Sequence, residues 1–233
     1  MTTITTHNPV RSDVPAAPAP TPRAGQGRGW ALAGVGAGLA GIGTIVTSSA
    51  VSAVYDEDLL GDAAGIAAKL ETQAGWMFAF HSITVVGALL TVIFAAGLYR
   101  RLAGAMPDSS VPLVAFAGLF GTAVVSVLGS GLDTEFMMSF AFGDGVVAAD
   151  NAAMYNHWIG TIPWVWVLSG LTGTGLYAAA RRGVVPRWIG RVGLVLGGLT
   201  LALGISPLEY MAAAPGALWL LATAAGFAFG DRA

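Results

Sequence analysis

The chain has 233 residues, of which 55% are hydrophobic and only 10% are charged, and its formal net charge is −2. Roughly a quarter of the residues of a soluble domain are charged, so this composition excludes an ordinary soluble domain and indicates a membrane protein. Cysteine is absent, which excludes disulfides, iron–sulfur clusters and thiolate catalysis. We expect the lipid bilayer to be the main partner, and we expect no nucleic acid.

Residues 1–28 are rich in proline, threonine and alanine. We expect a disordered cytoplasmic tail, because such a composition buries too little apolar surface to fold. Residues 29–231 are predicted to be a transmembrane domain, since six apolar stretches have about the 20 residues that cross roughly 30 Å of hydrocarbon. These stretches are Trp30–Tyr55, Trp76–Tyr99, Val111–Leu132, Trp158–Ala180, Trp188–Leu208 and Tyr210–Gly230. The predicted fold is an all-α polytopic bundle of six transmembrane helices.

The charged residues indicate the orientation of this bundle. If six helices alternate in direction, ten of the eleven basic residues fall on one side of the membrane and ten of the thirteen acidic residues fall on the other. Cytoplasmic loops are enriched in arginine and lysine, so the basic side is predicted to be cytoplasmic. The sequence therefore predicts a multi-pass protein of the inner membrane with both termini in the cytoplasm and an acidic outer face.

Two segments on the acidic side are too short to cross. Residues 58–73 place apolar side chains at helical spacing, which predicts an amphipathic helix on the outer membrane surface. The run Phe136–Phe142, which ends at the turn Gly143–Gly145, is predicted to be an interfacial turn or a short helix. We expect Pro163 to kink the fourth transmembrane helix near its outer end.

Pairs of glycines four residues apart occur in the first and fifth predicted helices, at Gly34 and Gly38 and at Gly193 and Gly197. Such pairs allow close approach of helices. We expect packing within the monomer, in preference to a dimer interface.

The second and third predicted helices resemble the fourth and fifth. The spacing from Pro112 to Glu135 equals that from Pro186 to Glu209, and each copy has a histidine, His81 or His157, near its start. Both copies run from outside to inside and back, so we predict a parallel internal repeat about an axis along the membrane normal.

This repeat would bring His81, His157, Glu135 and Glu209 around one cavity that opens outward. Ionisable groups at membrane depth are costly and suggest function. The four residues fit a metal site, because histidine and carboxylate ligands suit zinc, iron or manganese. They also fit structural hydrogen bonding between helices, acid–base chemistry, or haem ligation by the two histidines, and haem is the less favoured cofactor. We expect each histidine to point into the bundle and to meet a carboxylate or a backbone carbonyl, with Glu135 or Glu209 as the favoured partner.

No catalytic motif was found, so no catalytic residue is predicted and the ligand and substrate stay undefined. The favoured hypothesis is a membrane protein with an acidic outer vestibule that binds a cation, metal or small ligand. The alternatives are a membrane enzyme that acts on a lipid or isoprenoid substrate through histidine and glutamate, and a haem-binding electron carrier.

Three short segments carry a family resemblance: Gly61–Ala64, Leu98–Leu102 and Val185–Gly190. The chain, over roughly residues 30–230, resembles a bacterial family of six-helix membrane proteins whose function is not known. The resemblance implies the same six-helix bundle in a bacterial membrane and implies no activity or catalytic residue.

The predicted orientation can be tested with reporter fusions. We expect fusions after Arg101, Arg182 and Ala233 to report a cytoplasmic location, and fusions near Asp62, Asp144 and Pro207 to report an external one, because of the arginine distribution. An external location for Ala233 would refute the six-helix topology.

Overall fold

The structure, a computed structural model, describes residues 27–142 and 147–230, and every element in these ranges is helical. The α-helices are α1 (Gly29–Ala50), α2 (Ala63–Thr72), α3 (Ala74–Ala105), α4 (Val111–Gly131), α5 (Asp133–Phe142), α6 (Ala149–Thr161), α7 (Val167–Arg181), α8 (Arg187–Val192), α9 (Gly198–Ile205) and α10 (Ala213–Ala225). Short 3₁₀ turns are η1 (Ala53–Tyr55), η2 (Glu57–Leu59), η3 (Ile162–Trp164) and η5 (Glu209–Met211), and π-helical segments are η4 (Gly193–Gly197) and η6 (Gly226–Gly230). The expected turn at Gly143–Gly145 and most of the expected tail lie outside the described residues.

The expected all-helical fold is confirmed. Five helices in the described ranges are long and apolar enough to cross a membrane: Gly29–Ala50, Ala74–Ala105, Val111–Phe142, Arg187–Ile205 and Glu209–Gly230. Each coincides with one of the expected transmembrane stretches, and the third also includes the short helix expected at Phe136–Phe142, which is part of α5.

The fourth expected span, Trp158–Ala180, is not a continuous helix. Helix α6 ends at Thr161, the 3₁₀ turn η3 follows, and α7 starts at Val167. Proline has no backbone N–H and clashes with the preceding turn, so Pro163 interrupts the helix where only a kink was expected. Helix α7 has 15 residues, or about 22 Å at 1.5 Å per residue, and is too short to cross the hydrocarbon alone.

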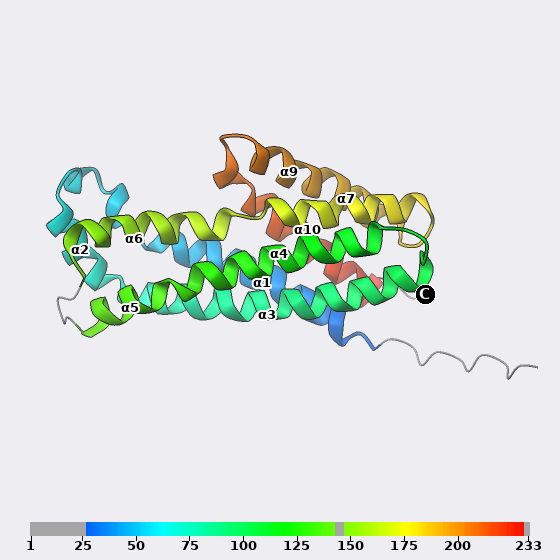
Figure 1. The fold of residues 1–233 in the computed structure, drawn as a ribbon, viewed down its shortest axis with the longest axis horizontal. Helices are drawn as coiled ribbons and strands as arrows, with labels where there is room; N and C mark the ends of the chain where they lie inside the picture. Colours follow the sequence, from blue (N-terminus) through cyan, green and yellow to red (C-terminus); the bar gives the residue numbers. More distant parts are fainter. Residues whose placement is uncertain (1–26, 143–146, 231–233) are drawn as a thin grey trace, which may run out of the picture.

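The helices pack in a closed ring. Helix α1 packs against α3 and α10, α4 packs between α3 and α7, and η4 packs against both α7 and α10. Helices α3, α4 and α7 lie along the long axis of the molecule (Figure 1). The expected repeat, in which the second and third predicted helices match the fourth and fifth, stays a prediction. The two copies differ in one respect, because α3 is continuous where α6 and α7 are separated.

The first and last described helices meet at one end of this ring. The ring of Trp30, at the start of α1, lies 5.4 Å from that of Phe227 in η6. The guanidinium of Arg101, near the end of α3, lies 5.3 Å from the centre of the Phe227 ring, and the side chain of Arg182 contacts Met106 after α3. We call this the arginine end.

A second apolar core lies at the opposite end. Helix α3 has 32 residues, about 48 Å, and extends well beyond a hydrocarbon layer of about 30 Å. There it packs with α2, α5 and α6 (Figure 1) around buried residues of all four helices and the η1 segment. We call this unit the cap; its buried residues are Val51, Ala53, Ile66, Leu70, Met77, Phe80, Met137, Phe140, Ala152, Tyr155, Ile159 and Ile162.

Helix α2 corresponds to the amphipathic helix expected at residues 58–73, but its apolar face is directed differently. Ile66 and Leu70 are buried in the cap core, and Leu70 is 0% exposed. Helix α2 packs against α6. Its apolar face therefore covers protein, not lipid, because the long helices extend far enough to meet it.

Glycines make the closest helix contacts, and these contacts are within the monomer as expected. A Cβ atom on Gly34 would meet Phe94 and Ala224, and one on Gly38 would lie 2.7 Å from the Cα atom of Leu221. A Cβ on Gly173 in α7 would lie 2.8 Å from the carbonyl oxygen of Gly193. The backbones of α7 and η4 are thus in direct contact, which no larger residue permits.

We expect Gly193→Ala to destabilise the protein by about 1–3 kcal/mol, because its methyl group collides with the carbonyl oxygen of Gly173. Gly198→Ala is the matched control, since a Cβ there meets no atom within 4 Å. Thermal unfolding in detergent measures both variants. Equal melting temperatures for the two would contradict the close contact.

The buried side chain of Asn156 connects α6 to the chain that follows α1. Its Oδ1 accepts from the N–H of Val54 at 2.9 Å, and its Nδ2 donates to the carbonyl of Val51 at 2.7 Å. We expect Asn156→Ala to cost about 1–3 kcal/mol, because it leaves these backbone groups without partners. Asn151→Ala, at an exposed position of the same helix, serves as the control in the same unfolding assay.

Candidate functional site

The first of the predicted site residues, His81, faces protein. It lies on α3 and is half-buried, and its Nδ1 is 3.0 Å from the carbonyl oxygen of Ser130 on α4. The expectation that this histidine points inward to a backbone carbonyl or a carboxylate is confirmed. Its partner is the carbonyl and not a glutamate, so the contact joins α3 to the end of α4.

The other three predicted residues lie nearer the surface. The same expectation is wrong for His157 on α6, which is exposed and whose ring meets that of Tyr55 edge-on at 5.9 Å. Glu135 on α5 is exposed, and Glu209 in η5 is half-buried. Within residues 27–142 and 147–230, no three histidine, aspartate or glutamate side chains gather in an arrangement that could hold a metal ion. Metal binding by the four residues stays a prediction that this geometry does not favour.

A different acid, Asp133, is the most unusual polar residue of the cap. It is the first residue of α5 and is 0% exposed. Neither carboxyl oxygen has a hydrogen-bond partner among the described residues. Burying a polar group without a partner costs several kcal/mol, and a charge costs more. Such a group is a candidate functional residue because its burial needs a compensating interaction.

In the sequence, Asp133 was one of the ten acidic residues assigned to the outer side, but helical spacing could have indicated its burial. Asp133, Met137 and Phe140 follow one another at intervals of four and three residues, which places them on one face of α5. Met137 and Phe140 are buried in the cap core. The carboxyl group points the same way because it shares their face.

Tyr155 on α6 is the second buried polar group near this carboxyl. Its side chain is 2% exposed, and its hydroxyl has no hydrogen-bond partner among the described residues. The Tyr155 ring is stacked on that of Phe136, with centroids 4.6 Å apart and planes 8° apart. The ring of Phe140 is tilted against it, with a centroid distance of 6.0 Å.

An aromatic hollow of about 220 Å³ opens on the α5–α6 side of the cap. No charged side chain of the described residues lines it, and the one side-chain amide is that of Asn151. The indole of Trp158 is held in place by donation from Nε1 to the carbonyl of Gly129 at 3.2 Å. The hollow is lined by Leu132, Phe136, Asn151, Met154, Tyr155 and Trp158.

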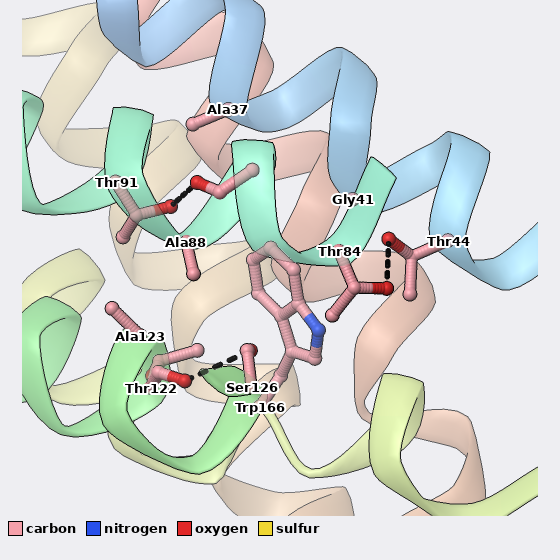
Figure 2. A pocket seen from close by; sticks show the side chains of 11 residues that line it. Ala37, Gly41, Thr44, Thr84, Ala88, Thr91, Thr122, Ala123, Ser126 and Trp166 are labelled. Atoms are coloured by element: carbon pink, nitrogen blue, oxygen red, sulfur yellow. Dashed lines mark hydrogen bonds between the residues drawn. The ribbon is translucent and has the colours of Figure 1, made fainter. Parts of the chain in front are cut away.

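A second cavity lies in the middle of the bundle, between α1, α3 and α4. Figure 2 shows the indole of Trp166, from the break before α7, among the hydroxyl groups that line it. Thr44 and Thr84 are hydrogen-bonded at 3.1 Å, and Thr91 donates to the carbonyl of Gly87 in its own helix. The cavity has a volume of about 20 Å³, which is room for about one water molecule. It is a packing feature around the broken helix and is too small for an organic ligand.

Comparisons with known proteins give no identity. The chain matches no family model, no curated protein and no solved structure. The resemblance to a bacterial six-helix family therefore stays a prediction, and the geometry of the cap is the basis for a functional proposal.

Proposed function

We propose that this protein crosses the membrane six times, has both termini in the cytoplasm, and binds a small organic cation in its cap on the outer side. Five helices in the described ranges are long and apolar enough to cross a membrane, which indicates that the protein is embedded in one. The sixth crossing starts at Trp158 near the end of α6 and continues through η3 and α7. The ligand site is the aromatic hollow, and Asp133 provides the countercharge.

Two observations support the orientation. The contact of Trp30 with Phe227 puts the start of the first helix and the end of the last at the same end, as an even number of crossings requires. The C-terminal ends of α3 and α7, which carry the two arginine pairs, also lie at this end of the molecule. Because arginine-rich ends favour the cytoplasm, the cap is on the outer side.

The observation that carries the ligand proposal is the buried, unpartnered carboxyl of Asp133. It adjoins the hollow, because Leu132 directly before it and Phe136 one turn after it line the hollow. Tyr155 of the cap core forms another part of the same wall. An organic cation over the rings of Tyr155 and Trp158 would gain cation–π attraction. It would also offset the cost of a buried carboxylate.

The lining favours an organic cation over a metal ion. Calcium and magnesium take six or more oxygen ligands, and zinc takes nitrogen, sulfur or carboxylate ligands. The hollow instead presents aromatic and aliphatic carbon, with the amide of Asn151 as the polar side-chain group in its lining apart from the ring substituents of Tyr155 and Trp158. Aromatic surfaces with a nearby negative charge are the arrangement that recognises alkylammonium groups. Enzymatic activity and haem binding stay sequence-based alternatives.

The test is calorimetric titration of the purified, full-length protein in detergent with tetramethylammonium. We expect saturable binding to the wild type and binding at least about tenfold weaker to Asp133→Asn, a difference of about 1.4 kcal/mol or more. The melting temperature of Asp133→Asn should not fall, because the carboxyl has no partner to lose among the described residues.

Two controls make the test specific. Glu135→Gln removes an acid from the exposed face of the same helix and should leave the affinity within about twofold. Tert-butanol, which has a similar shape without the charge, should bind much more weakly than tetramethylammonium. Equal affinity of wild type and Asp133→Asn, or equal binding of the neutral compound, would exclude the proposed site.

A further inference from the structure

At the arginine end, a large hollow lies between the end of α7 and the start of α8. It has a volume of about 570 Å³, and three of its side chains are arginines from the two helices. No carboxylate of the described residues lines it. Its lining residues are Tyr177, Ala180, Arg181, Gly183, Arg187 and Arg191.

The backbone explains why these arginines converge. Gly183 has a φ of 73°, a left-handed conformation that suits glycine and turns the chain back after α7. The N–H of Val184 donates to the carbonyl of Ala179 at 3.0 Å, which closes the turn. Arg187 and Arg191 are four residues apart and so share a face of α8. The corner thus directs basic side chains from both helices into one space.

The positive charges of this corner are not neutralised within the described part of the chain. All three arginine residues are exposed. The ion pair found among the described residues joins Lys69 to Asp56 in the cap region, far from this corner. Three guanidinium groups around one hollow repel one another, so an anion in the hollow would relieve the repulsion. Guanidinium groups bind phosphate oxygens in pairs, which makes phosphate the best-matched anion.

The surface beside the hollow indicates that this phosphate belongs to a lipid. Three and four residues after Arg191, Leu194 and Val195 are 41% and 64% exposed, and Leu199 one turn later is 46% exposed. These residues belong to the Arg187–Ile205 helix that is long and apolar enough to cross a membrane. A phospholipid can place its headgroup in the hollow and its acyl chains along this apolar strip, whereas a free phosphate uses the hollow alone.

We propose that the α7–α8 corner is a binding site for an anionic phospholipid, with Arg181, Arg187 and Arg191 around its phosphate. The site is separate from the cation site of the cap and rests on different residues. Each exposed arginine near a membrane surface contributes about 1 kcal/mol to attraction of anionic lipid, which corresponds to about a fivefold change in affinity.

Native mass spectrometry of the full-length protein in detergent, with added phosphatidylglycerol or phosphatidylcholine, tests this site. We expect one phosphatidylglycerol molecule to be retained in preference to phosphatidylcholine, and a rise in melting temperature with phosphatidylglycerol alone. Arg187→Gln with Arg191→Gln should weaken retention more than about tenfold. Arg100→Gln, at an exposed position of the same end outside the hollow, should weaken it less than about twofold.

A soluble competitor separates the two sources of phosphate. Glycerol phosphate shares the headgroup but has no acyl chains, so we expect it to bind at least about tenfold more weakly than phosphatidylglycerol, since burial of each CH₂ group contributes about 0.8 kcal/mol. Equal binding of the two would make this a site for soluble phosphate and overturn the lipid assignment. Retention of phosphatidylglycerol that is unchanged in the double variant would show only general attraction to basic loops, and would overturn the site itself.

Discussion

The architecture depends on the difference in length between the helices and the hydrocarbon layer. At about 1.5 Å per residue, the 32 residues of α3 are roughly 18 Å longer than a layer of about 30 Å, and this excess is divided between the cap and the arginine end, where α3 continues to Ala105. At the cap end, apolar side chains of α3 such as Met77 and Phe80 need partners that shield them from water. Helices α2, α5 and α6 provide them, and the cap core that results is separate from the core of the bundle.

The cap and the arginine end differ in how they hold charge. In the cap, the carboxyl of Asp133 is buried without a partner, close to an aromatic hollow. At the arginine end, the guanidinium groups around the α7–α8 corner are exposed and have no carboxylate in the lining of their hollow. Each arrangement leaves a charge of one sign available to a ligand of the other sign. The proposed ligands, an organic cation and an anionic lipid, follow from this difference.

Most helix positions could be predicted from the sequence, because long apolar runs with aromatic or arginine ends have few other interpretations. The break between Thr161 and Val167 was placed only approximately, since a proline indicates a disturbed helix but not how many residues it disturbs. The inward contact of His81 was predicted, but its partner, the carbonyl of Ser130, was not, because backbone acceptors are common to every helix. The burial of Asp133 was missed because its spacing from Met137 and Phe140 shows only that they share a face of a helix, and not that α2 and α6 cover that face.

The break in the α6–α7 segment has a mechanical consequence. Helix α3 passes through both bundle and cap as one rod, whereas α4 and α5 are joined through Leu132, and α6 and α7 through residues 162–166. Bending stiffness is therefore concentrated on one side of the molecule. If the cap tilts against the bundle, the break at residues 162–166 is the place where the chain can bend with the least disruption of helical hydrogen bonds.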